Sequence, residues 1–377
     1  MRILTVSHFF EDHGGGIERV AGHLCRNFAR FGVTSVWAAS DSDALPIGDI
    51  EPVPLKCLNP TEKLTGLPMP LPGLRGIRTL AREVRRSDAV VIHDALYATS
   101  IIALLTAKMR HKRVILIQHI AAIPFTSRVL RILMSIANYL ITRPMLRAAD
   151  ERVFISDTVR RDLLGSHAEE TSELLFNGVD ARIFHPAKDK IRKLDPVPKI
   201  PPNGRRMLFV GRYVEKKGLR VLRALAEARP DWTFLLVGSG PIRPEEWNLA
   251  NLHNLGPQSQ EALADLYRSA DVLILPSVGE GYPLVIQEAM ACGLPIVCGT
   301  PSDRADPDAA RWLRGVRIDL NDVVSSARRC AEAVDDLRLD ARERAAMAKY
   351  ATRTYDWSST AKNLVVLAKQ TKRRVAN

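Results

Sequence analysis

Short apolar runs of strand character alternate with helical stretches along most of this 377-residue chain. In the first half, strands are predicted at residues 2–7, 34–39, 89–93, 114–118 and 152–155, with helical stretches between them that include 16–31 and 80–86. Repeated strand–helix units predict a parallel sheet that is covered by helices on both faces. The first half is therefore expected to form an α/β domain.

A tract rich in proline and lysine, residues 185–206, interrupts this pattern and is typical of a linker. The alternation then restarts, with strands predicted at 206–210, 233–237, 272–275 and 296–298. The chain also exceeds the length at which a single core stops growing. We therefore expect two Rossmann-like domains, residues 1–190 and 206–355, joined by a linker at 191–205 and facing a central cleft, where ligands usually bind.

The composition is that of a soluble globular protein, with 46% hydrophobic and 25% charged residues. The five cysteines are scattered without a CxxC spacing, so neither a disulfide framework nor a zinc site is indicated. No stretch approaches the roughly 20 apolar residues that span a bilayer, and the first residues look like a core strand rather than a signal peptide. A reducing, cytoplasmic setting is expected.

The net charge of +12 is unevenly distributed along the chain. Residues 75–147 contain 13 Lys or Arg and only three acidic residues, a net charge of +10. Such a field favours a polyanion or an anionic membrane surface as a partner. A non-enzymatic polyanion-binding protein is therefore one alternative, although no helix-turn-helix, zinc or aromatic-basic pattern indicates nucleic acid.

The segment around residues 271–297 is expected to run from strand to loop to helix to strand. Pro283 suits the first position of the helix, which would end near Cys292, and Gly293 suits the residue just after it. The free amides at the start of this helix would lie at the carboxyl end of a parallel strand. Both features are typical of an anion-binding site.

Two acidic residues flank that expected anion site. Glu280 lies in the loop and Glu288 lies five residues into the helix, with seven residues between them. Their carboxylates could accept hydrogen bonds from hydroxyl groups on either side of a bound diphosphate. A nucleotide-sugar, which carries a sugar at each end of its diphosphate, fits this arrangement.

The run Pro-Ser…Glu-Gly-Tyr-Pro-Leu…Glu-Ala-Met-Ala-Cys-Gly-Leu-Pro-Ile-Val resembles the acidic motif of the family 4 retaining glycosyltransferases (glycosyl transferases group 1), which have the GT-B fold. The resemblance implies that Glu280 contacts the transferred sugar and that Glu288 holds the nucleotide ribose. It places the donor beside Gly281, Tyr282, Pro283 and Leu284. It also implies that a C-terminal helix, residues 356–377, crosses back onto the first domain, and that the protein acts in bacterial polysaccharide biosynthesis.

Two basic residues are expected at the start of the second domain. A predicted strand ends in Gly-Arg at Arg212, and Lys217 precedes the next helix, so both cations lie at the carboxyl edge of the sheet. Fixed cations stabilise the charge that develops on a departing diphosphate. The stretch resembles the family's Gly-Arg…Lys-Gly motif, in which Arg212 and Lys217 are the basic positions. Lys216 is the weaker candidate and is expected to face solvent.

No metal cofactor is expected. The Asp-x-Asp pattern formed by Asp41 and Asp43 is predicted to lie in a loop rather than at a strand end. Arg212 and Lys217 can neutralise the diphosphate in place of a cation.

Glycines mark two further donor-binding positions. Gly15 and Gly16 follow the first strand and resemble the family's Gly-Gly loop, whose backbone reaches toward the donor from the first domain. A tight turn is the alternative for these two residues. Gly238 ends a strand of the second domain and resembles the Gly-x-Gly-Pro turn near the nucleotide.

Three histidines end predicted strands of the first domain. His119 matches the family's histidine that contacts the donor sugar or phosphate, and it is the candidate catalytic histidine. His8 and His93 also face the ligand side of the sheet. A structural role as strand-end residues is the alternative for each of them.

The resemblance implies a retaining glycosyltransferase that moves a sugar from a UDP- or GDP-sugar donor to a glycan or lipid-linked acceptor. The acceptor would attack from the face that the diphosphate leaves, so the protein need not supply a conventional base. A nucleotide-sugar epimerase of the same fold is the alternative enzyme.

Residues 121–149 form an apolar stretch punctuated by arginines, and Pro144 should end or kink any helix there. One interpretation is a buried helix that covers the sheet. The other is an amphipathic helix at the inner membrane face, held by basic residues that include those at 110–113. Residues 46–76 are rich in proline and glycine and are predicted to form a long surface connection, with a mobile loop over the acceptor site as the alternative.

Overall fold

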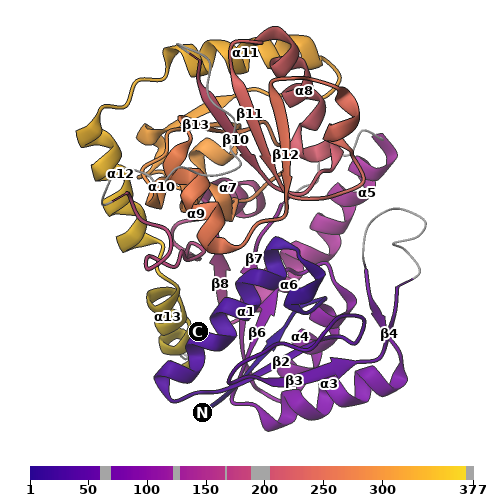
Figure 1. The fold of residues 1–377 in the computed structure, drawn as a ribbon. Helices are drawn as coiled ribbons and strands as arrows, with labels where there is room; N and C mark the ends of the chain where they lie inside the picture. Colours follow the sequence, from indigo (N-terminus) through magenta and orange to yellow (C-terminus); the bar gives the residue numbers. More distant parts are fainter. Residues whose placement is uncertain (60–68, 122–127, 166–167, 188–203, 371–377) are drawn as a thin grey trace. The chain divides into compact units, whose positions relative to one another are not determined.

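A computed structural model describes residues 1–59, 69–121, 128–165, 168–187 and 204–370 (Figure 1). The chain divides into two compact units, and each has its own sheet. The first unit contains residues 1–178 and 357–377, and the second contains residues 179–356. Most of the predicted linker, 191–205, lies outside the described residues.

A seven-stranded sheet forms the centre of the first unit, in the order β3-β2-β1-β6-β7-β8-β9, and every neighbouring pair is parallel. Its strands are β1 (Arg2–Val6), β2 (Thr34–Ser40), β3 (Glu51–Leu55), β6 (Ala89–His93), β7 (Arg113–Gln118), β8 (Glu151–Phe154) and β9 (Glu173–Leu174). The long helices are α1 (Gly16–Phe28), α3 (Leu74–Arg86), α4 (Ala98–Met109), α5 (Arg128–Ala137), α6 (Arg143–Ala148), α7 (Asp157–Leu164) and α13 (Trp357–Lys369). The predicted strands and the parallel arrangement are confirmed.

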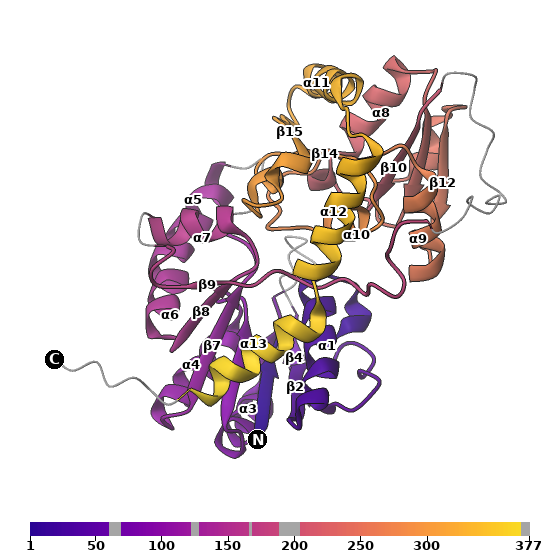
Figure 2. The ribbon, with the colours of Figure 1, turned by 90° about the vertical axis from the view of Figure 1, so that its left-hand side faces the viewer.

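Helices cover both faces of this sheet. Apolar side chains of α3, α4, α6 and α7 pack with strand residues such as Leu4, Val90 and Leu116 in one buried cluster. α1 contributes Ala21 and Cys25 to a second cluster. The last helix, α13, contacts α1 and β7, and Figure 2 shows it lying across the sheet of the first unit. The expectation that the C-terminal helix packs on the first domain is thus confirmed.

The prediction that residues 46–76 form only a long surface connection is wrong in part. β3 extends the sheet beside β2, and β4 (Cys57–Leu58) pairs with β5 (Leu71–Pro72) in an antiparallel ladder. β3 contains Pro52 and Pro54, which obscured its strand character in the sequence. It tolerates both because it is the edge strand, where a missing N–H removes no hydrogen bond from a second neighbour.

The apolar stretch at 121–149 is not one continuous α-helix. A π-helix, η3 (Asn138–Thr142), separates α5 from α6, and Pro144 lies in the first turn of α6. A proline there would disrupt an uninterrupted α-helix because it lacks the N–H that bonds one turn back. The wider turn before Pro144 agrees with the predicted interruption.

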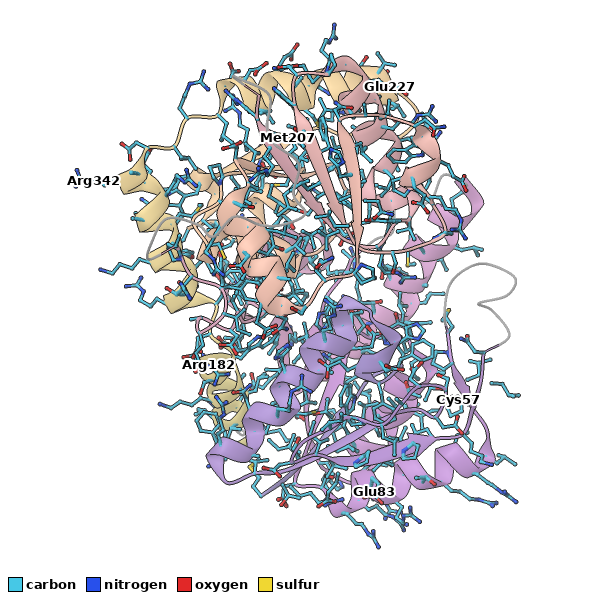
Figure 3. All side chains as sticks on the ribbon, in the orientation of Figure 1. Cys57, Glu83, Arg182, Met207, Glu227 and Arg342 are labelled. Carbon is cyan, nitrogen blue, oxygen red and sulfur yellow. The ribbon has the colours of Figure 1, made fainter. Side chains whose placement is uncertain are left out.

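The second unit contains a parallel sheet in the order β12-β11-β10-β13-β14-β15. Its strands are β10 (Arg206–Val210), β11 (Thr233–Val237), β12 (Leu252–Gly256), β13 (Val272–Leu275), β14 (Ile296–Gly299) and β15 (Leu313–Val316). Its long helices are α8 (Leu219–Ala228), α9 (Gln260–Ser269), α10 (Leu284–Ala291), α11 (Val323–Asp336) and α12 (Ala341–Thr354). Met207, labelled in Figure 3, is fully buried on the central strand β10.

None of the described helices combines the length and the apolar character needed to cross a membrane.

Candidate functional site

Glu280 and Lys217 form an ion pair in the second unit. Glu280 lies in the loop between β13 and α10, and its Oε2 is 3.1 Å from Nζ of Lys217, with each side chain only 14% exposed. Nζ of Lys216, a more exposed residue, lies 3.8 Å from Oε1 of Glu280. Burial alone would raise the pKa of Glu280, but the two ammonium groups outweigh it and lower that pKa. Glu280 is therefore a carboxylate at neutral pH.

Backbone contacts bring these two sequence motifs together. Lys216 and Lys217 belong to a 3-10 helix, η5 (Glu215–Lys217), and the Val278 N–H donates to the carbonyl of Lys216 over 2.9 Å. Gly218 ends η5 with φ of 74°, and a Cβ atom there would lie 2.1 Å from the Pro276 carbonyl oxygen. Only glycine permits this approach of the two chain segments.

Arg212 follows β10 after one intervening residue, Gly211, and is exposed. Within the described ranges, its guanidinium takes part in no ion pair. Nearby, the Gly211 N–H donates to the Val237 carbonyl, and a Cβ atom on Gly238 would lie 1.9 Å from the Gly211 carbonyl oxygen. The glycine at 238 is therefore needed for contact between two strand ends. Arg212 remains a cation that can meet an anionic ligand at the carboxyl edge of the sheet.

Glu288 lies on α10, the helix that follows the loop containing Glu280. It is half-buried, and its Oε2 accepts a hydrogen bond of 2.9 Å from the hydroxyl of Tyr267 on α9. Tyr267 is buried and was not among the residues predicted from the sequence. It orients the Glu288 carboxylate, because a hydrogen bond from a fixed donor restricts the rotation of the acceptor.

Replacing Glu288 with alanine should weaken the binding of a nucleoside diphosphate. A hydrogen bond between a charged carboxylate and a ribose hydroxyl contributes about 1.5–3 kcal/mol, which corresponds to a roughly 10- to 150-fold rise in Kd. Isothermal titration calorimetry with UDP and GDP measures this change. Tyr267→Phe should cause a smaller loss in the same direction. An unchanged Kd for Glu288→Ala would remove Glu288 from ribose binding.

The loop after Glu280 is anchored by tyrosines. The Tyr282 hydroxyl lies 2.8 Å from that of Tyr355, which donates to Oδ2 of Asp306 over 2.6 Å. Tyr350 donates to the same oxygen over 2.8 Å. The side chain of Tyr282 is buried in this network, so the backbone is the part of Tyr282 that can meet a ligand.

The amides of the same loop lead into α10. Pro283 is the N-cap of this helix and Leu284 is its first residue, one position later than predicted. Gly281 is buried in the preceding loop.

In the first unit, the glycine loop precedes α1. Gly15 is the N-cap of α1 and Gly16 is its first residue. A Cβ atom on Gly15 would lie 2.1 Å from a carboxylate oxygen of the buried Glu18, so the lack of a side chain at Gly15 leaves space for that carboxylate. Glu18 Oε1 lies 2.8 Å from Nε2 of His8, whose ring stacks on that of Tyr97 at 3.9 Å between centroids. The sequence-predicted His8 is therefore held by neighbours on α1 and at the start of α4.

His119 and His93 come together at the carboxyl edge of the same sheet. His119 directly follows β7, His93 ends β6, and the two rings meet with Nδ1 of His93 3.0 Å from Nε2 of His119. Both are buried, at 3% and 0% exposure. Burial lowers the pKa of His119 well below its usual value and that of His93 to about 3. Both rings are neutral at pH 7.

Asp94, which follows His93, was not predicted from the sequence. Its backbone has a φ of 58°, in the left-handed region, and Oδ1 accepts a 2.9 Å hydrogen bond from the His119 N–H. The other oxygen, Oδ2, is buried without a hydrogen-bond partner in the described part of the chain. Burial raises the pKa of Asp94 to about 7. Strained, buried polar residues of this kind cluster at functional sites.

Asp94→Asn should stabilise the first unit at high pH. Protonated Asp94 resembles Asn, whereas ionised Asp94 is a buried anion. The raised pKa means that wild-type stability is greatest below the ordinary Asp pKa and declines as the pH rises toward 7. At pH 8 a gain of about 1 kcal/mol would raise Tm by roughly 2–4 °C. Thermal unfolding followed by circular dichroism at pH 5 and pH 8 tests this, and a gain that does not grow with pH would contradict it.

Across the described ranges, no three His, Cys, Asp or Glu side chains gather as metal ligands. Asp41 and Asp43 lie in a loop, as predicted, but β2 continues to Ser40, so this loop begins directly at a strand end and that part of the prediction is wrong. Their carboxylates have different partners: Asp41 accepts from the Cys57 N–H, and Asp43 contacts His13, each at 3.3 Å.

Two family models match this chain. Residues 14–182 match the glycosyltransferase family 4 model, and residues 204–336 match the glycosyl transferases group 1 model. The first matched range contains Gly15 and His119, and the second contains Lys217 and Glu280. The matches therefore fall on both groups of residues described above.

Curated relatives of this chain are also named as glycosyltransferases. The chain is 30% identical to a D-inositol 3-phosphate glycosyltransferase of Thermobispora bispora, over 60% of this chain and 57% of that protein. It is 33% identical to a phosphatidyl-myo-inositol mannosyltransferase of Mycobacterium leprae, over 60% of each chain. The chain thus spans little more than half the length of these curated relatives.

Two solved structures show the fold. A sucrose-phosphate synthase from Thermosynechococcus elongatus superimposes with a TM-score of 0.68 at 19% identity, covering 98% of both chains. Anabaena HepE in complex with UDP-glucose gives a TM-score of 0.67 at 17% identity, covering 97% of this chain and 98% of that one.

Proposed function

Because this chain belongs to the family 4 glycosyltransferases, with the GT-B fold, we propose that it transfers a sugar from a UDP- or GDP-sugar to a glycan or lipid-linked acceptor, with retention of anomeric configuration. The ion pair between Lys217 and Glu280 carries this proposal, together with Arg212, which has no ion-pair partner among the described residues and lies five residues before Lys217. We propose that the carboxylate of this ion pair binds a sugar hydroxyl and that its cation binds the diphosphate. The bound UDP-glucose of the HepE structure supports a donor of this class.

Each residue has a proposed role in the reaction. Arg212 and Lys217 bind the diphosphate, and Glu288 accepts hydrogen bonds from the ribose. As the bond from the sugar C1 to the phosphate oxygen breaks, the acceptor oxygen bonds to C1 on the same face. The acceptor proton passes to the departing phosphate oxygen. The two cations stabilise the charge on that oxygen, which is why we propose that no metal is needed.

A panel of nucleotide-sugars tests the function. The purified protein is incubated with UDP- and GDP-hexoses, and release of the nucleoside diphosphate is measured with and without EDTA. We expect turnover of one donor class, unaffected by EDTA, and a product with the donor's anomeric configuration. A strict requirement for a divalent metal would contradict the proposed role of Arg212 and Lys217. Interconversion of free nucleotide-sugars without transfer would favour the epimerase.

We also propose that the first unit contacts the cytoplasmic face of an anionic membrane, as suits an enzyme of polysaccharide biosynthesis. Apolar side chains of α5 and η3 are 47–66% exposed at Ile132, Leu133, Ile136, Tyr139 and Leu140. Their spacing lies near one helical face. This exposed apolar stripe supports the amphipathic interpretation for α5 and η3, whereas α6 packs in the buried core cluster, as the other interpretation predicts.

Basic residues on the same helical layer supply the complementary charge. α3 presents five exposed arginines, Arg75, Arg78, Arg82, Arg85 and Arg86. α4 packs against α3, and Leu105 and Met109 of α4 are 56% and 78% exposed. α4 and α6 contribute to one core cluster with α3, so these helices cover the same face of the sheet. Arginines interspersed with apolar side chains suit an anionic lipid surface better than a soluble polyanion.

Liposome co-sedimentation should detect this contact. Binding should increase with the fraction of anionic lipid and decrease with salt. Because each basic residue near such a surface contributes about 1 kcal/mol, the Arg78→Gln/Arg85→Gln double variant should lose roughly 30-fold in affinity. Ile132→Ser/Ile136→Ser should weaken the part of vesicle binding that persists at high salt, because this part depends on apolar contact.

Exposed residues of the second unit provide matched controls. Arg223→Gln/Arg243→Gln removes the same charge, and Val324→Ser removes an apolar side chain that is 76% exposed. Both should bind vesicles as the wild type does. A wild-type protein that ignores anionic vesicles at low salt would refute the membrane contact and favour a soluble acceptor.

A further inference from the structure

The contact between His93 and His119 constrains where the protons of both rings lie. Nδ1 of His93 and Nε2 of His119 are 3.0 Å apart, and neither ring is charged at pH 7. Two N–H groups would repel each other at this distance, and two lone pairs would leave both nitrogens without a hydrogen bond. One of the two nitrogens therefore carries a proton, and its ring donates to the other.

The environment of His93 decides which ring donates. Its second nitrogen, Nε2, is buried and has no hydrogen-bond partner among the residues that the structure describes. If His119 donated, this nitrogen of His93 would carry an unsatisfied N–H. If His93 donates from Nδ1, the same nitrogen carries only an unused lone pair. Buried donors without partners are rarer than underused acceptors, which favours donation by His93.

Donation by His93 determines the chemistry of His119. Its Nε2 then accepts, so the neutral ring must carry its proton on Nδ1. His119 would present an N–H donor to a ligand at the carboxyl edge of the sheet, where parallel sheets bind ligands. The backbone of His119 is held at the same time by its hydrogen bond to Asp94.

We propose that His93 is a positioning residue that holds the His119 ring in the Nδ1–H tautomer, so that His119 donates a hydrogen bond to a hydroxyl oxygen of the bound sugar or acceptor. The part of this proposal that concerns a sugar ligand rests on the proposed function. A donor of this kind binds an oxygen without taking a proton from it, which agrees with a reaction that needs no conventional base from the protein.

The surroundings of the pair contain other titratable groups. Glu18 contacts His8 on one side of the site, Asp94 follows His93, and the half-buried Tyr97 stacks on His8. Within the described residues, none of these four side chains hydrogen-bonds to a ring nitrogen of His93 or His119, so the two rings hold each other.

Two substitutions of His93 separate positioning from packing. His93→Asn keeps an N–H donor close to the position of Nδ1, whereas His93→Leu fills similar space without one. Long-range ¹H–¹⁵N spectra of protein labelled at its nine histidines report the tautomer of each ring. The His119 signals are assigned by their loss in His119→Gln.

The wild-type spectrum should show His119 protonated on Nδ1. The same tautomer should persist in His93→Asn, and His93→Leu should show a mixture. Because misplacing a group in contact with substrate lowers turnover, kcat of His93→Leu should fall roughly 10- to 100-fold, with partial recovery in His93→Asn. The Kd for the nucleoside diphosphate should stay unchanged, since its proposed ligands lie in the second unit. Circular dichroism checks that both variants fold.

The outcomes distinguish this proposal from the proposed function. The tautomer is measured without substrate, so it stands even if no nucleotide-sugar is turned over. A wild-type His119 protonated on Nε2, or an unchanged His119 tautomer in folded His93→Leu, would overturn the role of His93. If the tautomers of the wild type and of His93→Leu are as predicted but kcat of His93→Leu is unchanged, the positioning of His119 for the reaction is overturned.

Discussion

Arg212→Ala should reduce kcat by about 100- to 1000-fold while leaving the stability of the protein unchanged. Removing one fixed donor from a charge that develops in the transition state costs about 2.7–4 kcal/mol of activation free energy. Arg212 is exposed and lacks an ion-pair partner in the described part of the chain, so its removal leaves no buried group uncompensated. Steady-state release of nucleoside diphosphate and thermal unfolding measure the two effects.

Lys217→Met should show a similar fall in kcat with a different effect on stability. Lys217 is the closer cation to the largely buried Glu280, and after its removal only Lys216, at 3.8 Å, remains near that carboxylate. The pKa of Glu280 should rise toward its ordinary range. In the wild type, this ion pair stabilises the protein above the ordinary pKa range of a carboxyl group, and the stabilisation is lost as the pH falls through the lowered pKa of Glu280. Lys217→Met lacks most of this stabilisation, so it should lose less stability than the wild type on acidification.

Arg220→Ala is the matched control for both variants. Arg220 lies at the start of α8 and is exposed, and it pairs with Glu215 of η5, which is also exposed. Its removal should change neither kcat nor Tm appreciably, because exposed ion pairs contribute little. Wild-type turnover by Arg212→Ala would refute the proposed stabilisation of the leaving diphosphate.

The sequence predicted the central strands of both sheets because parallel strands buried on both faces are continuous apolar runs. It predicted α10 because Pro283 and Gly293 mark its two ends. It also placed Glu280 and Lys217 at strand ends, and parallel strand ends share one edge of a sheet. The structure adds that these two side chains pair with each other.

Other features could not be predicted because they depend on tertiary contacts. Tyr267 meets Glu288 from a different helix, and nothing in the spacing of 21 residues indicates that contact. Asp94 was missed because its left-handed backbone and its bond to the His119 N–H arise only when β6 and β7 pair. Its position directly after a strand-end histidine was the one available signal. β3 was missed because its prolines are tolerated only at a sheet edge.

Glu280→Gln should lower kcat by about 100-fold and should not weaken the binding of the nucleoside diphosphate. The substitution keeps the shape of the side chain but removes the charge that a sugar hydroxyl would meet, and charge-assisted hydrogen bonds are roughly twice as strong as neutral ones. Calorimetry measures the Kd for UDP or GDP, and steady-state kinetics measure kcat. Glu288→Gln should show the reverse pattern, with the larger effect on Kd.

The ion pair gives this prediction a sharper form. In the unliganded protein Glu280 competes with the diphosphate for Lys217, because their charged groups lie 3.1 Å apart. In Glu280→Gln that competition is removed, so the diphosphate should bind more tightly than it binds the wild type. Weaker binding would mean that Glu280 itself holds the nucleotide. If kcat remained at the wild-type value, Glu280 would have no contact with the transferred sugar, and its pairing with Lys217 would serve only to orient the lysine.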